Sequence, residues 1–253
     1  LFRSNVVEAG LNHVLVSIHG HDARTHDALT RTQGAFVQTL AGLANLALLK
    51  RKYPLKVHTA FVVNKRNFRY LREFVEAMRP FDVDQHVFNL LMPDGGGLVF
   101  FDQLMPRYSD VAAEFADLVA RLPPEDVERM FLLDAPLCTT EGLPARVRGY
   151  VERYFHFEPD RAPLYADVQD QTSAAGPDAG EVTFRRAALE IEGNRFSKVA
   201  KSLTDSLVRV FRPECDRCRH RPACRGVERE YVERFGWDEF VPVSDEPPPR
   251  GGR

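Results

Sequence analysis

Short apolar runs alternate with amphipathic stretches along the first half of the chain. The apolar runs are rich in β-branched residues, which is typical of buried strands, and they cover residues 13–19, 56–63 and 83–91. The stretches between and after them repeat apolar residues at helical spacing, over residues 32–50, 67–79 and 106–122. Strands and helices that alternate with short connections predict a parallel sheet with right-handed crossovers.

The second half of the chain has a less regular pattern. A further strand is predicted at 127–133, and the remaining segments predict a smaller α+β module. These segments are a helix at 144–157, a loop rich in proline and glycine at 158–180, a strand at 181–192, and helices at 195–210 and 226–235. We therefore expect an α/β domain over 1–135, the module over 136–243 and a disordered tail over 244–253.

Composition narrows the class of protein. The chain has 253 residues, 44% of them hydrophobic and 28% charged, as in a globular protein. Its formal net charge of −2 argues against a general nucleic-acid binder. We find neither a signal-peptide pattern nor an apolar run of roughly 18 residues, so we expect a cytoplasmic protein that does not enter the membrane. In a reducing compartment, cysteines are metal ligands more often than disulfide partners.

Three of the four cysteines lie close together, as Cys215-x2-Cys218-x5-Cys224, and the fourth is Cys138. Thiolates select zinc or iron–sulfur clusters over hard cations, so the four predict one tetrathiolate metal site. The spacing alone also allows a structural zinc site, for which His220 competes as a ligand, or three free thiols in a loop.

Residues 10–97 resemble the second half of the partial (β/α)6 barrel of radical S-adenosylmethionine (radical SAM) enzymes. The resemblance is carried by VLVSIHGHDARTHDALT, GAFVQTLAGLANL, AFVVNKRNFRYLREFVE and HVFNLLMPDGG. It implies the C-terminal part of a TIM-like barrel, with S-adenosylmethionine bound at the carboxyl ends of the strands. It implies cofactor contacts from Ser17, Asn64, Asn89 and Met92. Two alternatives remain open: Ser17 caps a turn, and Asn64 begins a helix.

The cysteine region resembles the auxiliary-cluster modules of the same superfamily, called SPASM or twitch domains. Their pattern begins C-x2-C-x5-C and usually continues with a cysteine four positions on, where this chain has Glu228. The resemblance therefore implies one auxiliary [4Fe–4S] cluster, held by Cys215, Cys218, Cys224 and, as our candidate for the fourth ligand, Cys138.

One departure from the family is large, because residues 1–137 contain no cysteine and therefore no CxxxCxxC loop for the catalytic cluster. The first residues, LFRSNVVEAG, predict the last turns of a helix ending at Gly10. We therefore expect an enzyme fragment that is inactive alone; a degenerate relative is the alternative. The intact enzyme is expected to generate a 5′-deoxyadenosyl radical, to modify a peptide or protein side chain, and to take electrons from an external donor.

Two other interpretations remain. A non-catalytic interaction protein stabilised by zinc is the rival explanation of the cysteines. A string of histidines and aspartates is also found in metal-dependent hydrolases, although the ligands expected on later strands are not evident; it consists of His19, His21, Asp22, His26 and Asp27. The glycines at 95–97 permit close approach of the backbone to a ligand, or form a flexible loop.

Overall fold

The computed structural model describes residues 6–148 and 209–244, which fall into two compact units. Among the described residues, the first unit contains 6–148 together with Trp237–Val243, and the second contains 209–236 and Ser244. Residues 136–148 and 237–243, which the sequence assigned to the cysteine module, thus group with the sheet. Several predicted segments lie wholly or partly outside the described residues: the helix at 144–157, the loop at 158–180, the strand at 181–192, the helix at 195–210 and the tail.

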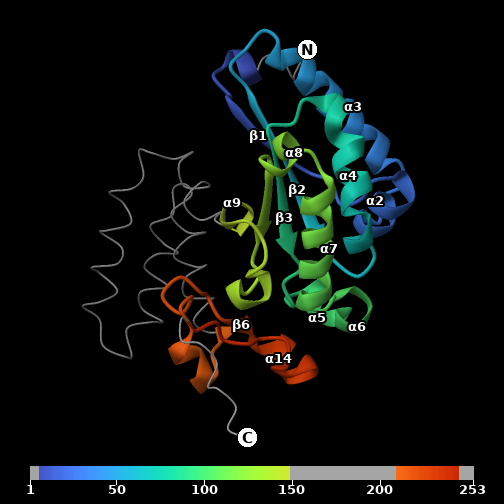
Figure 1. The fold of residues 1–253 in the computed structure, drawn as a ribbon. Helices are drawn as coiled ribbons and strands as arrows, with labels where there is room; N and C mark the ends of the chain where they lie inside the picture. The colour runs from blue at the N-terminus through green and yellow to red at the C-terminus, as the bar shows by residue number, and fades with distance from the viewer. Residues whose placement is uncertain (1–5, 149–208, 245–253) are drawn as a thin grey trace, which may run out of the picture. The chain divides into compact units, whose positions relative to one another are not determined.

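A four-stranded parallel sheet forms the centre of the first unit (Figure 1). Its strands are neighbours in chain order, which is the order that successive right-handed strand–helix units produce. The three strands predicted from apolar runs are confirmed, and the fourth begins at residue 130 instead of 127. The strands are β1 (His13–Ser17), β2 (Lys56–Val63), β3 (Gln85–Leu90) and β4 (Met130–Leu133).

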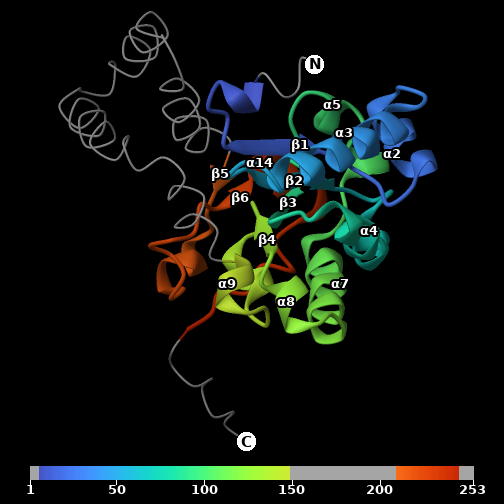
Figure 2. The same ribbon diagram turned by 90° about the horizontal axis from the view of Figure 1, so that it is seen from above.

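The longer helices lie on one side of this sheet in both ribbon views (Figures 1 and 2). They are α2 (Ala23–Thr30), α3 (Ala35–Lys50), α4 (Leu71–Met78) and α7 (Tyr108–Arg121). Shorter helical segments connect them: η1 (Phe68–Tyr70), η2 (Arg79–Phe81), α5 (Gly96–Val99), α6 (Phe101–Leu104), α8 (Pro124–Val127), η3 (Leu137–Thr140) and α9 (Ala145–Arg148). Residues 6–8 are helical as well, and Gly10 follows with φ 104°, in agreement with the helix end predicted there.

Aromatic rings fill the space between the sheet and its helices. Phe61 of β2 and Phe88 of β3 stand on the same face, with ring centroids 5.6 Å apart. Phe74 of α4 approaches them at 4.5 and 5.8 Å, and Phe115 of α7 approaches Phe88 at 5.1 Å. Each of these rings is at most 1% exposed. Burial of this much aromatic surface is the main stabilisation of the unit.

The parallel register assigns a second set of residues to the opposite face. Ser17 pairs with Ala60 and Val62 pairs with Asn89, so these positions alternate with the aromatic ones along each strand. On β1, Leu15 remains 43% exposed and Ser17 is exposed. In a closed barrel this face would line the interior. Here the part of the face that lies on β1 is exposed to solvent.

Charged side chains cluster around Asp84, where β2 and β3 begin. Asp84 accepts hydrogen bonds from Lys50 (2.8 Å), Lys56 (3.2 Å) and the Val57 amide (2.8 Å). These charge-assisted bonds join α3, β2 and the start of β3, and they hold the pKa of Asp84 below its usual value although burial opposes this.

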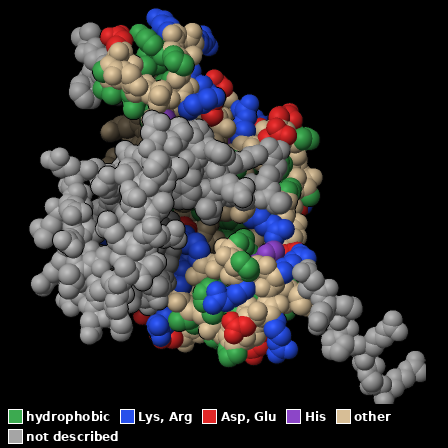
Figure 3. Space-filling view, turned by 90° about the vertical axis from the view of Figure 1, so that its left-hand side faces the viewer, with side chains coloured by type: hydrophobic (Ala, Val, Ile, Leu, Met, Phe, Trp, Pro, Cys, Tyr) green, Lys and Arg blue, Asp and Glu red, His purple; other side chains and the backbone are tan. Residues whose placement is uncertain are grey.

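Over the face shown in Figure 3, basic and acidic side chains are interspersed, in agreement with the small net charge.

The C-terminal segment Trp237–Val243 returns to the first unit and joins the N-terminus of α7. Glu239 accepts a hydrogen bond from the Ser109 amide at 2.7 Å, and its other oxygen lies 3.4 Å from Arg107. Phe240 is 1% exposed, with its ring 5.8 Å from that of Tyr108. A carboxylate at this position satisfies a free helical N–H and interacts favourably with the helix dipole.

The described part of the second unit is small. Strands β5 (Arg209–Val210) and β6 (Val227–Glu228) pair antiparallel, the segment η6 (Pro213–Arg217) begins the cysteine loop between them, and α14 (Arg229–Phe235) follows. The helix predicted at 226–235 is confirmed for most of its length. Within the ranges that the structure describes, no helix is both long and apolar enough to span a membrane.

Replacing Glu239 by Gln should weaken the attachment of the C-terminal segment. The amide retains an acceptor oxygen but loses the charge opposite Arg107 and the helix N-terminus, whereas Glu239→Ala removes the cap as well. We expect Glu239→Ala to cost about 1–2 kcal/mol of unfolding free energy and Glu239→Gln less. Urea unfolding measures both; equal stability of Glu239→Ala and the parent chain would contradict a capping role.

Acid should destabilise the first unit through its buried histidines. Burial lowers the pKa of His58 and of His86 from 6.5 to about 4. The unfolded chain therefore takes up protons that the folded chain does not as the pH falls from 6.5 to 4, and stability is lost across that window. Each unit of pKa depression corresponds to about 1.4 kcal/mol.

Urea unfolding at pH 7.5, 6.0 and 5.0 measures this loss. His86→Gln should flatten the pH dependence, because its side chain does not titrate, even though it lowers stability at pH 7.5. An unfolding free energy that is the same at pH 7.5 and 5.0 would contradict the assignment.

Candidate functional site

Four residues predicted to contact the cofactor lie at the carboxyl edge of the sheet. Ser17 is the last residue of β1, Asn64 follows the last residue of β2, Asn89 is next to last in β3, and Met92 is two residues beyond β3. Because the strands are parallel, their carboxyl ends meet at one edge, which is where ligands bind in barrel and open α/β folds. Ser17 and Asn89 also share the face opposite the aromatic core.

Asn64 is buried and its amide is already hydrogen-bonded to the backbone. Its Nδ2 donates to the Val62 carbonyl at 3.0 Å, and its Oδ1 accepts from the Arg66 amide at 2.9 Å. The side chain is 3% exposed, and its bonds fix the turn after β2. This agrees with the alternative in which Asn64 begins the helix that follows. Contact between these four residues and S-adenosylmethionine stays a prediction.

Asn67 has a larger structural role than the sequence indicated. It directly precedes η1, but its side chain makes no capping bond to that helix. Its Nδ2 instead donates to the His19 carbonyl at 3.0 Å and the Val62 carbonyl at 2.8 Å, while its Oδ1 accepts from the Asn64 amide at 2.8 Å. The fully buried amide thus joins the ends of β1 and β2 to the following turn.

The histidine and aspartate string after β1 is used for local structure. Nδ1 of His19 accepts from the Val62 amide at 3.1 Å, and Nδ1 of His26 accepts from the His19 amide at 3.0 Å. Burial, with His26 nearby, lowers the pKa of His19 to about 4, so both rings are neutral at pH 7.

The two aspartates of the string cap helices. Asp22 accepts from the Thr25 amide at 2.8 Å and caps α2, a helix that the sequence did not predict. Asp27 accepts from the Gly34 and Phe36 amides at 2.7 and 2.8 Å, at the start of α3. Structural bonds therefore account for four of the five residues of the string, which argues against a hydrolase metal site. His21 is the exception, because its buried Nδ1 has no hydrogen-bond partner among the described residues.

The glycine-rich segment after β3 is a short helix, not a flexible loop. Residues Gly96–Val99 form α5, and the amides of Leu98 and Val99 bond to the Gly95 carbonyl. A Cβ atom on Gly97 would lie 2.3 Å from the Met92 carbonyl oxygen, so this glycine permits close approach of two backbone segments. We expected this glycine segment to let the backbone approach a ligand, but Gly97 instead lets the backbone approach the Met92 carbonyl.

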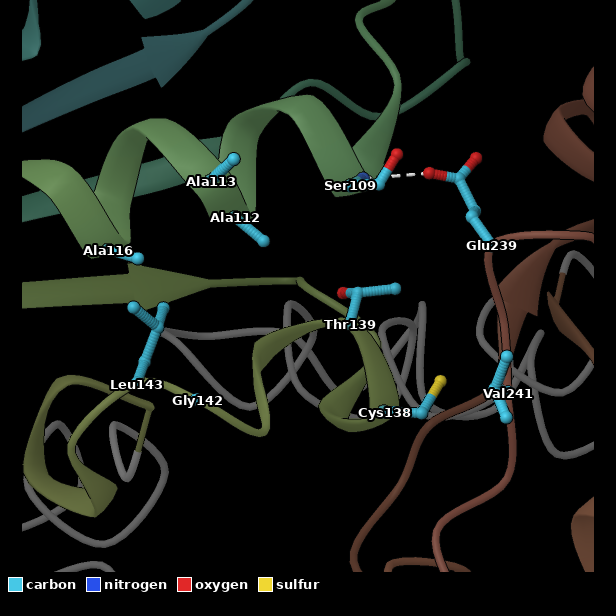
Figure 4. Close-up of a pocket in the computed structure, with 10 residues that line it drawn as sticks. All are labelled: Ser109, Ala112, Ala113, Ala116, Cys138, Thr139, Gly142, Leu143, Glu239 and Val241. Atoms are coloured by element: carbon cyan, nitrogen blue, oxygen red, sulfur yellow. Dashed lines mark hydrogen bonds between the residues drawn. The ribbon is translucent and has the colours of Figure 1, made fainter.

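A pocket of about 400 Å³ lies beside Cys138 in the first unit (Figure 4). One wall is the exposed side of α7, where small residues leave space, and the others are η3, the turn after it and the C-terminal segment. The sulfur of Cys138 points toward the space between α7 and Val241 in Figure 4. Its lining consists of Ser109, Ala112, Ala113, Ala116, Cys138, Thr139, Gly142, Leu143, Glu239 and Val241.

The cysteine loop of the second unit is a series of tight turns. The Cys218 amide donates to the Cys215 carbonyl at 3.0 Å, and the Cys224 amide donates to the His220 carbonyl at 2.7 Å. The Gly226 amide donates to the sulfur of Cys224 at 3.4 Å. All three thiols are half-buried, whereas the residues between them are mostly exposed. Thiolates are the ligand type that zinc and iron–sulfur clusters prefer, but the described positions of these three side chains do not form a metal site.

Glu228, which stands four positions after Cys224, forms a buried ion pair. Glu228 on β6 lies 2.5 Å from Arg209 on β5, and the two side chains are 4% and 2% exposed. A buried carboxylate paired in this way is held by its partner, because a buried charge is costly unless it is paired. The carboxylate of Glu228 is therefore engaged by Arg209 in the described structure.

The described residues do not themselves gather three His, Cys, Asp or Glu side chains closely enough to hold a metal ion. Cys138 belongs to the first unit and the other three cysteines to the second, and the two are described separately. Convergence of the four sulfurs on one centre stays a prediction.

Removing the Asn67 amide should destabilise the first unit more than any exposed asparagine. Asn67→Ala leaves the Asn64 amide and two carbonyls without their buried partner, which costs about 1–3 kcal/mol per unsatisfied group. Asn45→Ala on α3 is the matched control, because its bond to Ala41 is exposed and Ala favours the helix. Urea unfolding compares the two; similar losses for both variants would contradict the role of Asn67.

Comparison with known proteins gives one partial relationship. No protein-family model matches the chain. A stretch of 90 residues is 38% identical to the AdoMet-dependent heme synthase of Methanosarcina barkeri (strain Fusaro / DSM 804). The stretch covers 35% of this chain and 24% of the relative, so the chain matches about a quarter of that protein. AdoMet is S-adenosylmethionine, and the match therefore supports a relationship to the radical SAM family that residues 10–97 resemble.

Proposed function

We propose that this chain is part of a radical SAM enzyme with an auxiliary iron–sulfur cluster. The observation that carries the proposal is the 38% identity over 90 residues with an AdoMet-dependent enzyme. The parallel sheet, with strands in chain order and helices on one side, is compatible with part of a TIM-like barrel. In this family, S-adenosylmethionine bound to a reduced cluster supplies the radical that abstracts a substrate hydrogen.

In this proposal the carboxyl edge of the sheet faces the cofactor. Ser17 and Asn89 offer a hydroxyl and an amide on the open face, and both are at least partly accessible. Met92 is half-buried at the same edge. Asn64 contributes indirectly, since its amide fixes the turn that ends β2.

The residues of this chain do not fit the catalytic cluster, because residues 1–137 contain no cysteine to bind it. We therefore assign those ligands to sequence outside this chain, or, in the alternative, regard the protein as a degenerate relative. The auxiliary cluster has ligands here. Cys215, Cys218 and Cys224 would hold it from the second unit, and Cys138 is the proposed fourth ligand.

Two substrate classes are candidates. Family members with auxiliary-cluster modules often modify peptides, which favours a peptide or protein side chain. The relative is named a heme synthase, which favours a tetrapyrrole of the heme type as the second candidate. Either reaction would use an external electron donor.

Metal analysis separates the enzyme from the zinc-stabilised interaction protein. The chain is purified anaerobically, and its iron, sulfide and zinc are measured with its absorption spectrum. About four irons per chain and a broad visible absorption support the cluster. One zinc and no visible absorption would support the interaction protein.

Cysteine variants test the ligand set. Changing Cys215, Cys218 or Cys224 to Ser should each abolish the cluster and lower the stability of the second unit, because metal binding is coupled to folding. Cys138→Ala should do the same if Cys138 is the fourth ligand. A full iron content in Cys138→Ala would show that the fourth ligand is another group, such as His220 or the substrate.

The isolated chain should not cleave S-adenosylmethionine under reducing conditions, because it lacks thiolates for the catalytic cluster. Formation of 5′-deoxyadenosine is measured by chromatography with dithionite as reductant. A longer parent protein that contains a CxxxCxxC loop should form it, and a longer protein that lacks that motif would favour the degenerate relative.

A further inference from the structure

Two histidines meet on the face of the sheet that lies opposite the long helices. His13 begins β1 and His58 is the third residue of β2, and Nε2 of His13 lies 3.0 Å from Nδ1 of His58. The rings cross at 80°, with their centroids 4.3 Å apart. Leu15 pairs with His58 in the register, so both histidines stand on the face that also carries Leu15. The contact therefore joins two neighbouring strands toward their amino-terminal ends.

Both imidazoles are neutral at pH 7. His58 is 2% exposed, and burial lowers its pKa to about 4. Burial also lowers the pKa of His13, although the nearby carboxylate of Asp84 opposes this. A neutral imidazole has a lone pair to give to a metal ion, whereas an imidazolium ion has none. The pair is thus in the protonation state that metal binding requires.

The separation of the two nitrogens is that of two ligands on one metal ion. Metal–imidazole bonds are about 2.0–2.1 Å long, and ligand angles of about 90–109° then place two nitrogens about 2.9–3.4 Å apart. The 3.0 Å between His13 and His58 lies within this range. Without a metal, one ring donates a hydrogen bond to the other across the same gap. A metal ion takes the place of that proton, which moves to the other nitrogen of its ring.

An amide stands beside the pair. Gln85 on β3 pairs with His58 in the register, so it lies on the same face of the sheet. It is 6% exposed, and its Nε2 has no hydrogen-bond partner among the described residues. A buried polar group in this condition is costly and indicates a further binding partner. Half a turn of the amide exchanges its nitrogen for its oxygen, which is a metal ligand.

The remaining ligands of such an ion would be neutral. In the described parts of the chain, no third His, Cys, Asp or Glu side chain joins the pair. The carboxylate of Asp84 is engaged by Lys50, Lys56 and the Val57 amide. A site made of imidazole, amide and water suits Zn²⁺, Ni²⁺ or Cu²⁺ better than Mg²⁺ or Ca²⁺, which prefer carboxylates.

We propose that His13 and His58 bind one divalent transition-metal ion of the kind that prefers imidazole, with Gln85 and water completing its coordination. The ion is bonded to Nε2 of His13 and Nδ1 of His58, and each ring keeps its single proton on the other nitrogen. It links β1, which lies at the edge of the four-stranded sheet, to β2. The site is separate from the four cysteines and does not depend on the proposed function.

Nickel binding to the 253-residue chain tests the site. The chain is prepared without a histidine tag, and its thiols are alkylated in the folded state so that they do not compete for Ni²⁺. We expect one Ni²⁺ per chain, bound about tenfold or more weakly by His13→Gln, because half of the imidazole ligands are lost. Isothermal titration calorimetry measures the affinities, and circular dichroism checks folding. Since His13 is only half-buried, His13→Gln is expected to keep the fold.

His86→Gln is the matched control. His86 is also buried and lies on the neighbouring strand β3, but it faces the helices and bonds to Thr59 at 2.8 Å. Its loss should leave the affinity for Ni²⁺ unchanged. Equal affinities of His13→Gln and His86→Gln would overturn the proposal and leave the histidine pair as a hydrogen bond only.

Stability gives a second measurement on the same chains. A ligand that binds only the folded state stabilises it, so Ni²⁺ should raise the urea midpoint of the parent chain and of His86→Gln. It should not raise the midpoint of His13→Gln or His58→Gln. A midpoint that rises equally in all four chains would show that Ni²⁺ binds elsewhere and would contradict the site.

Discussion

The buried amide of Asn67 joins the two strand ends on which the carboxyl edge of the sheet depends. Backbone groups lose their partners where parallel strands end, and each one left unpaired in the interior is costly. Asn67 satisfies three such groups, on the second residue after β1, on β2 and on the turn between β2 and η1. His19 and Asn64 complete the arrangement with bonds of their own. The edge therefore has a fixed shape, which a cofactor site requires.

The two faces of the sheet explain why that edge is available for binding. One face is covered by helices and filled by the rings of Phe61, Phe74, Phe88 and Phe115. The other carries smaller or polar residues, and its β1 side is open. An asymmetric sheet of this kind is compatible with part of a barrel, whose helices lie outside and whose ligands bind at the carboxyl ends of the strands.

The second unit stabilises its cysteine loop by different means. The loop has few large apolar residues, so its shape depends on turn hydrogen bonds, the stacking of Arg221 on Phe211 and the buried pair of Arg209 with Glu228. Ionic and metal-linked stabilisation commonly replace a hydrophobic core in segments of this size.

The sequence by itself determined the elements whose signal is local. Apolar runs located all four strands of the parallel sheet, although not β5 and β6. Helical periodicity located α3, α4 and α7, because the burial of one face leaves a regular pattern. Spacing alone identified the three clustered thiols as a set. Tertiary structure decided the contacts between distant residues: Glu239 caps a helix that begins 131 positions earlier, at Tyr108, and Glu228 meets Arg209. It also decided the role of Asn67, whose side chain bonds to the ends of β1 and β2 and not to the helix that it precedes. Such choices depend on which backbone groups the fold leaves unpaired, and no local pattern in the sequence records them.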